Sequence, residues 1–167
     1  MQYKSINEIE QFSFQDCEMI SFKTADSQIQ MVLEAVLVMP GNSQNPNYTM
    51  SYARTTNVRL QKARILSAVK DGYKYYDADG VLMEEVPDTP LSEDEINGLS
   101  ALFANSYFYA MDKLSEDNSL FTYCMHVEIP IRSEDEYDNT VQDSYTLEVS
   151  FENAIFEWDS YLNKAQL

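Results

Sequence analysis

Two segments alternate between apolar and polar residues, and this alternation constrains the fold more than any other feature of the chain. A period of two residues is typical of a strand with one buried face. The apolar positions of segments 120–131 and 144–151 are Phe121, Tyr123, Met125, Val127, Ile129, Ile131, Tyr145, Leu147, Val149 and Phe151. We therefore expect two strands, which pair most simply as a hairpin around the charged segment 132–143.

The first half of the chain carries further strand patterns separated by polar turns. Segments 17–23 and 28–38 predict two strands joined by the turn sequence "TADS", and "PGNSQNPN" at 40–47 predicts a loop. Strands are also expected at 58–69, 73–77 and 81–86. Asp71-Gly72 and Asp79-Gly80 would link them, because Asp-Gly pairs are favoured in hairpin turns.

One long amphipathic helix is predicted over about 92–114. Ser92 and Glu95 have the spacing of a capping box, and Leu91 and Ile96 stand at the two positions that pack together across such a cap. Apolar residues then recur at spacings of three and four, which is typical of a helix with one buried face. They are Ile96, Leu99, Leu102, Phe103, Tyr107, Ala110 and Leu114.

Together these patterns predict an α+β domain. Its antiparallel, strand-rich sheet would carry the helix of about 92–114 on one face, and short terminal helices are expected in 5–12 and 153–165. Strands do not alternate with helices, which disfavours a doubly wound parallel sheet. A length of 167 residues suits a single domain, 1–167.

Negative charge is concentrated in the second half of the chain. The net charge is −17, and residues 75–167 hold three Lys and Arg against 21 Asp and Glu, a charge of −18. Phosphate repels such a surface, so the composition argues against nucleic-acid binding and against an anionic membrane. It favours a basic protein as the partner, and it also keeps an acidic chain dispersed in water. The oligomeric state is left open.

Segments near the start of the chain bear on location. Residues 1–12 lack the apolar run of a secretory leader, and no window approaches 18 continuous apolar residues. We therefore expect a cytoplasmic protein. Its two cysteines, Cys17 and Cys124, are expected to be reduced thiols.

Catalytic and metal-binding patterns are weak. Cys124 and the sole histidine, His126, would share a strand face, but no third catalytic group is recognisable. In "YYDADGVLMEEVPD" at 75–88, placing Gly80 at loop position six leaves Tyr75 and Val86 where a calcium loop needs carboxylates. The segment is therefore interpreted as a hairpin turn. The sequence predicts no enzyme, no cofactor and no metal site.

Two functions from different classes follow. The first is a non-enzymatic interaction protein, immunity- or chaperone-like, whose acidic half docks a basic partner; the residues expected to dock are Glu134, Asp135, Glu136, Tyr137 and Asp138. The alternative is a small-molecule-binding domain with a Tyr- and Met-lined pocket between helix and sheet. The tyrosines expected to line it are Tyr73, Tyr75, Tyr76, Tyr107 and Tyr109.

The segments "FSFQDCEMISF" and "QIQMVLEAV" carry a local resemblance. The first begins at Phe12 and the second at Gln28, and their order is Phe, a polar residue, Asp and then alternating apolar positions. This pattern resembles the opening hairpin of small strand-rich domains in Gram-positive bacteria. The matching residues are Phe14, Gln15, Asp16, Met19 and Phe22. Many of those domains are uncharacterised and some look like immunity proteins against secreted toxins, so the resemblance implies a bacterial interaction protein.

Overall fold

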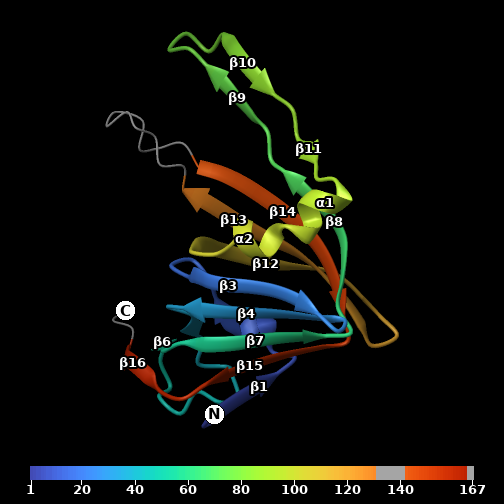
Figure 1. The fold of residues 1–167 in the computed structure, drawn as a ribbon. Coiled ribbons are helices and arrows are strands. Elements are labelled where there is room, and N and C mark those ends of the chain that lie inside the picture. Colours follow the sequence, from blue (N-terminus) through green and yellow to red (C-terminus); the bar gives the residue numbers. More distant parts are fainter. Residues whose placement is uncertain (131–141, 165–167) are drawn as a thin grey trace.

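The computed structural model describes residues 1–130 and 142–164, and antiparallel strands dominate it (Figure 1). Strands hold 60% of the residues and helices 8%. The prediction of an antiparallel, strand-rich fold is therefore confirmed. The predicted α+β class is wrong, because it required a long helix and the described residues contain only short ones.

A ten-stranded sheet forms the frame of the molecule, and each of its neighbouring strand pairs is antiparallel. Its order is β1 (Tyr3–Ile6), β15 (Asn153–Trp158), β7 (Thr56–Gln61), β4 (Gln28–Glu34), β3 (Glu18–Ala25), β12 (Ser106–Asp117), β13 (Leu120–Pro130), β14 (Gln142–Phe151), β8 (Arg64–Lys70) and β11 (Thr89–Pro90).

A second sheet of four short strands shares the core of the first. Its order is β16 (Tyr161–Lys164), β6 (Ser51–Ala53), β5 (Leu37–Val38) and β2 (Phe12–Ser13), and the 3-10 helix η1 (Ile9–Gln11) precedes β2. Phe12, Val38 and Ala53 from this sheet belong to the same buried cluster as the inner residues of the large sheet. Trp158 is fully buried there and stacks on Tyr3 at 5.6 Å between ring centroids.

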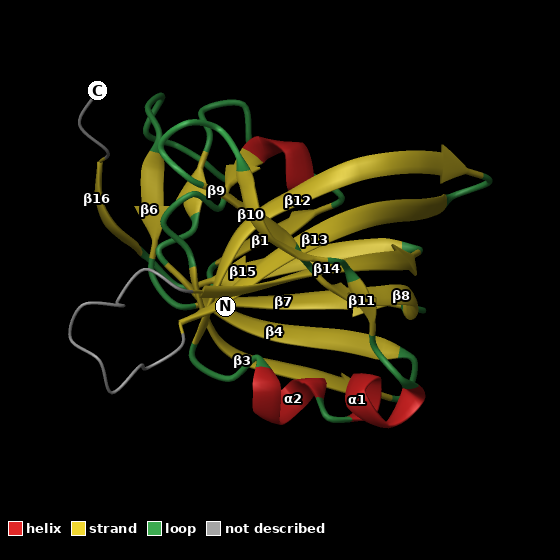
Figure 2. Ribbon diagram, turned by 90° about the horizontal axis from the view of Figure 1, so that it is seen from above, coloured by secondary structure: helices red, strands yellow, loops and turns green. Residues whose placement is uncertain are grey.

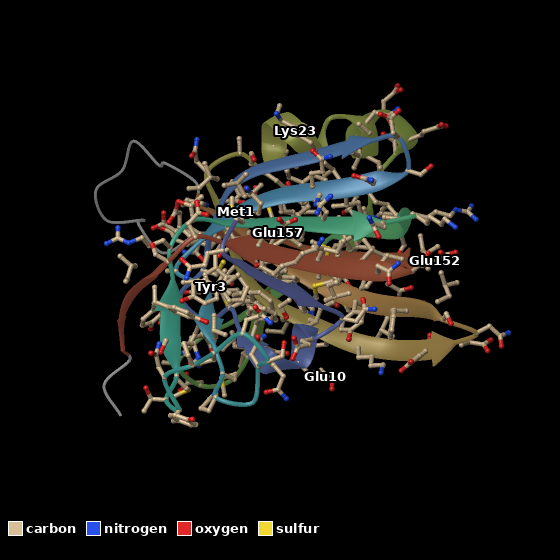
Figure 3. All side chains as sticks on the ribbon, turned by 90° about the horizontal axis from the view of Figure 1, so that it is seen from below. Met1, Tyr3, Glu10, Lys23, Glu152 and Glu157 are labelled. Atoms are coloured by element: carbon tan, nitrogen blue, oxygen red, sulfur yellow. The ribbon has the colours of Figure 1, made fainter. Side chains whose placement is uncertain are left out.

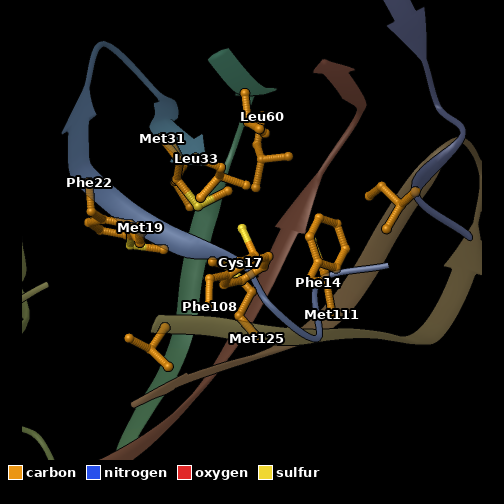
Figure 4. Close-up of a cluster of buried hydrophobic side chains, with 14 of the residues drawn as sticks. Phe14, Cys17, Met19, Phe22, Met31, Leu33, Leu60, Phe108, Met111 and Met125 are labelled. Carbon is orange, nitrogen blue, oxygen red and sulfur yellow. The ribbon is translucent and has the colours of Figure 1, made fainter. Parts of the chain in front are cut away.

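Alternation along the strands builds this core. Figure 4 shows side chains of the β2–β3 connection, the β3–β4 hairpin, β7, β12 and β13 meeting in one apolar cluster; the labelled ones are Phe14, Cys17, Met19, Phe22, Met31, Leu33, Leu60, Phe108, Met111 and Met125. Burying one large apolar side chain stabilises a fold by about 1.5–3 kcal/mol. The core faces of β13 and β14 are those that the sequence predicts, and their pairing as a long-looped hairpin is confirmed.

The long helix predicted over 92–114 is wrong, although its start is right. Ser92 and Glu95 form the predicted capping box, and α1 (Glu93–Asn97) and α2 (Leu99–Leu102) follow, lying beside β3 (Figure 2). Residues 106–117 are strand β12 instead, and Asn105 with φ of 57° separates it from α2.

A β-bulge explains why this strand has the spacing of a helix. In β12 the buried positions are Ser106, Phe108 and then Met111, because the register with β13 shifts between Phe108 and Ala110. A bulge inserts one extra residue, so a period of two changes locally to a spacing of three. The aromatic residues Tyr107 and Tyr109 favour strand over helix, and pairing with β13 decides the outcome.

The predicted terminal helices are also wrong. Segment 5–12 holds the end of β1, the three-residue η1 and the start of β2, while segment 153–165 holds β15 and β16. Ala154, Phe156 and Trp158 are all buried at the two-residue spacing of a strand, and Ile155 between them is buried as well. Pairing of β15 with β1 on one side and β7 on the other supplies the backbone hydrogen bonds that a helix would have made internally.

Turn positions agree with the sequence at two places and differ at two. The "TADS" turn joins β3 and β4 with positive φ at Asp26 and Ser27, and Gly80 with φ of 79° lies in the second predicted turn. The strand predicted at 58–69 is instead two strands, because the chain turns at Lys62. Asp71-Gly72 makes no hairpin turn, since β8 runs on into β9 (Tyr73–Tyr76).

Strands β8 and β9 form the outgoing side of a long hairpin, and β10 (Leu82–Val86) and β11 form its returning side. Lys70 faces Thr89 and Tyr73 faces Val86, so the same register continues across the break between the two ladders. Gly72 stands opposite Pro87 at the break, and proline has no N–H to donate. The half formed by β9 and β10 projects beyond the sheet (Figure 1). We call residues 73–86 the arm.

We predict that Gly72→Ala loosens the joint at the base of the arm. A Cβ at Gly72 would lie 2.0 Å from the carbonyl oxygen of Val86 and 2.5 Å from the carbonyl carbon of Pro87, so the two backbones must separate. We expect the free energy of unfolding to fall by about 1–3 kcal/mol in chemical denaturation. Gly98→Ala is the control, because its nearest atom is 3.5 Å away. Equal midpoints for Gly72→Ala and the unsubstituted protein would contradict this description of the joint.

Candidate interaction surface

The arm exposes large apolar side chains to solvent at a density found nowhere else among the described residues. Each of the six is between 45% and 62% exposed: Tyr73, Tyr75, Tyr76, Val81, Leu82 and Met83. Scattered single apolar residues are normal on a protein surface, but contiguous ones mark interaction sites. A two-stranded ribbon has no further layer on which to bury them.

Local hydrogen bonds shape the end of the arm. The carboxylate of Asp77 accepts hydrogen bonds from the backbone N–H groups of Asp79 and Val81, each at 2.9 Å. Gly80 supplies the positive φ that this turn requires. Asp77 therefore stabilises the turn, and among the described residues no group of three or more His, Cys, Asp or Glu side chains could hold a metal ion.

Charge on the arm is mainly negative. Lys74 is its one basic residue, and it lies across from Glu85 with 3.7 Å between the charged atoms. Asp77, Asp79 and Glu84 add to the negative side, so residues 73–86 carry a net charge of −3. The arm thus combines tyrosine rings and aliphatic side chains with an excess of carboxylates.

The base of the arm is fixed to the outer face of the large sheet. Thr146 on β14 donates to both carboxylate oxygens of Asp71, at 2.9 and 3.0 Å, and the Asp71 N–H donates to the Ser144 carbonyl at 2.8 Å. Because successive strand residues alternate between faces, Asp71, Tyr73 and Tyr75 belong to one face of the ribbon. The tyrosine face of the arm therefore continues from the outer face of the sheet.

That outer face carries a row of polar contacts that begins at Asp71, just after β8, and crosses β14, β13 and β12. From Asp71 the row passes to Thr146, whose hydroxyl lies 3.5 Å from His126 Nδ1, and then to Asp112, whose carboxylate lies 3.4 Å from His126 Nε2. Glu148 faces Cys124 across β13 and β14. We call Asp71, Asp112, Glu128 and Glu148 the acidic sheet face.

Two groups on this face, the Cys124 thiol and the Tyr109 phenol, have raised pKa values, and the negative charge of the face contributes to both. Burial first, and then the carboxylates of Glu148, Asp112 and Asp71, raise the pKa of the Cys124 thiol. Burial and then Glu128 and Asp71 raise the pKa of the Tyr109 phenol. Nearby carboxylates oppose the formation of a further anion, so both groups stay protonated at neutral pH.

This geometry does not favour a Cys–His nucleophile. Cys124 and His126 do share a strand face, as the sequence predicts. A reactive cysteine needs a positive environment that lowers its pKa, whereas the neighbours of Cys124 raise it. The pKa of the buried Cys17 thiol is also raised, mainly by burial and further by Glu18 and Glu34.

The predicted docking segment lies outside the described residues. It comprises Glu134, Asp135, Glu136, Tyr137 and Asp138. Its flanking strands are described, and Pro130 pairs with Gln142 at the end of the β13–β14 hairpin.

The predicted tyrosine pocket loses the helix that was to form one of its walls. Tyr73, Tyr75 and Tyr76 stand on the arm, whereas Tyr107 and Tyr109 stand on β12 of the large sheet. A hollow of about 320 Å³ does include the latter two tyrosines. The other residues that line it are Gln15, Asp16, Cys17, Glu128 and Gln142.

A second hollow, of about 330 Å³, lies over β3, β4, β7 and β15. Lys23, Arg59 and Glu157 line it together with neutral polar and apolar side chains, and Arg59 donates to Glu157 (Figure 3 labels Lys23 and Glu157). Charges of both signs meet in this hollow and one pair is already satisfied. Lys23 is then the one charged lining residue outside that pair among the described residues.

The sequence of 75–88 predicts a hairpin turn, but it does not predict that this hairpin is exposed as an arm. Its apolar residues Val81, Leu82 and Met83 were assigned to a strand of a larger sheet. The available signal was that both arm strands lack strict alternation, while both carry charges. Strands with a buried face show the clear alternation seen in β13 and β14.

No helix among the described residues is long and apolar enough to cross a membrane. Comparison of the chain with protein-family models, with curated proteins and with solved structures gave no match.

Proposed function

We propose that this protein is a non-enzymatic interaction protein that docks a basic protein partner through the arm and the acidic sheet face. The observation that carries the proposal is the projecting arm with its six exposed apolar side chains. Tyrosine is enriched among the residues that dominate binding energy at interfaces, and methionine is enriched at interfaces generally.

The unfavourable exposure of the arm to water supports its use as a docking element. Water contact with large apolar side chains is unfavourable, and an isolated two-stranded ribbon is marginally stable in water. Among the described residues the ribbon is held at its base, through the β8–β11 ladder, the Gly72–Asp88 hydrogen bond of 2.6 Å and the bonds from Asp71 to Thr146 and Ser144. A partner that covers both faces of the arm would bury these side chains and stabilise the ribbon.

Charge supports the choice of a basic partner. The arm and the neighbouring acidic sheet face are both negative, and they meet at Asp71. A second copy of this chain would bring one such surface against another, with a net charge of −17 on each molecule. Association with a positive surface is steered by attraction and weakens as salt screens the charges.

The proposed compartment rests on the two cysteines, and the proposed immunity- or chaperone-like role rests on the resemblance carried by residues 12–22 and 28–36. Cys17 and Cys124 are free thiols, which supports a reducing compartment and hence the cytoplasm. The raised pKa of Cys124 supports a binding role over a nucleophilic one. An immunity- or chaperone-like role, as the resemblance of the opening hairpin implies, stays a prediction.

Replacing the two most exposed apolar residues of the arm tests the docking surface. We expect Tyr75→Ser with Met83→Ser to weaken binding to the partner that co-purifies from the source organism by at least about tenfold, measured by calorimetry. The melting temperature should hardly change, because both side chains are more than 60% exposed.

Tyr48→Ser with Leu120→Ser is the matched control, since it removes exposed residues of the same kinds away from the arm. The control should bind as the unsubstituted protein does. Equal losses for the two double variants would remove the arm as the docking element.

Charge substitutions test where the steering originates. We expect Asp112→Asn with Glu148→Gln to slow association severalfold and to flatten its salt dependence, while dissociation changes little. Stopped-flow mixing with the partner at several salt concentrations measures both rates.

The four acids of segment 134–138, replaced by Asn or Gln, form the comparison variant. Sequence reasoning predicts that this variant slows association too, with little change in melting temperature. If only the segment variant slows association, the charge that steers the partner belongs to segment 134–138 and not to the acidic sheet face.

A further inference from the structure

The hollow beside Tyr107 and Tyr109 is built from three strands and one loop. Tyr107 on β12 faces Glu128 on β13, and Gln142 begins β14. The loop before β3 contributes Asp16, and its Cys17 carbonyl accepts the Phe108 N–H at 3.0 Å. This bond fixes the loop against β12, so the walls of the hollow belong to one rigid frame.

Its lining combines aromatic rings with carboxylates. Tyr107 is 42% exposed and Tyr109 is 37% exposed, so each ring is partly covered and partly open to a ligand. Asp16 and Glu128 supply two negative charges, and the lining contains no Lys, Arg or His. Asp16 also accepts a hydrogen bond from the Tyr52 hydroxyl at 2.8 Å, which orients that carboxylate.

Such a lining selects cations. The face of a tyrosine ring attracts an ammonium or guanidinium group that lies within about 6 Å of its centre. A carboxylate attracts the same group and can accept its N–H hydrogen bonds. An anion would meet two carboxylates without any compensating positive charge. The raised pKa of Tyr109, due to burial first and then to Glu128 and Asp71, agrees with this negative environment.

The position of the hollow indicates where the cation comes from. Glu128 belongs to the acidic sheet face, and Gln142 lies two residues before Ser144, whose carbonyl bonds the base of the arm. A basic protein lying along the arm and this face would therefore also cover the hollow. Its volume of about 320 Å³ can accommodate a single long side chain.

We propose that this hollow receives one arginine or lysine side chain of the basic partner, held by Tyr107, Tyr109, Asp16 and Glu128. The inference rests on the proposed function and adds the site at which the partner's cation is recognised.

A peptide with a single arginine tests the site without the partner. The probe is acetyl-Gly-Arg-Gly-amide, and the peptide with neutral citrulline in place of arginine is its control. Each is titrated into protein with ¹³C-labelled tyrosine rings, whose Tyr107 and Tyr109 signals are assigned with single Tyr→Phe variants. We expect the arginine peptide to shift both signals and the citrulline peptide to bind at least about tenfold more weakly.

Variants separate the ring contacts from the charge. Tyr109→Leu should weaken binding about threefold to tenfold, whereas Tyr109→Phe, which keeps the ring, should stay within about twofold of the unsubstituted protein. Glu128→Gln should weaken binding about threefold. Tyr48→Leu is the control for an exposed tyrosine outside the hollow and the arm, and it should have no effect.

Three results would overturn the assignment. They are equal binding of the citrulline peptide, equal loss with Tyr48→Leu and Tyr109→Leu, and no shift of either ring up to about 50 mM peptide. Failure of the peptide while arm variants still abolish partner binding would reject the hollow and leave the proposed function standing. If the peptide binds but the arm variants leave partner binding unaltered, the cation site in the hollow stands and docking through the arm is rejected.

Discussion

Cross-strand pairing along β13 is the interaction on which the rest of the structure depends. This strand pairs with β12 on one side and with β14 on the other over most of its length. Its alternation places Tyr123, Met125 and Val127 in the core and Cys124, His126 and Glu128 on the opposite face. The same ladder therefore produces both the apolar interior and the acidic outer surface.

The register of the ladders also explains the arm. Strand β8 joins the sheet by pairing with β14, and its hairpin partner β11 is only two residues long. Beyond Gly72 the hairpin continues in the same register as far as the irregularity between Leu82 and Glu84. Among the described residues no third strand pairs with β9 or β10, so their side chains have no core to enter. Their exposure follows from topology rather than from an unusual composition.

Local pattern was enough for some elements of this fold and insufficient for others. For the described residues of the segments with strict alternation, 120–130 and 144–151, the sequence predicts the correct faces and pairing. The capping box at Ser92 was also correct, because its hydrogen bonds are local. Residues 106–117 failed, since a bulge disguised the strand and only pairing with β13, a distant contact, determines its structure.

The candidate site shows the same division between local and distant information. The net charge of the second half is a property of the sequence, and it already pointed to a basic partner. The grouping of Asp71 with Asp112 and Glu148 depends on the order of β12, β13, β14 and β8, which no local pattern reveals. Tyr107 and Tyr109 line a hollow together, but their companions are Asp16 and Glu128 rather than the tyrosines of the arm.

Hydrogen–deuterium exchange of the arm, alone and with the partner, tests the central claim most directly. If the arm is a ribbon held only at its base, amides of 73–86 should exchange much faster than those of 121–129 in the isolated protein. Partner binding should then slow exchange in the arm and leave the core strands unchanged. Arm amides as protected as those of β13 in the isolated chain, or arm exchange that is unaltered by a bound partner, would contradict the account.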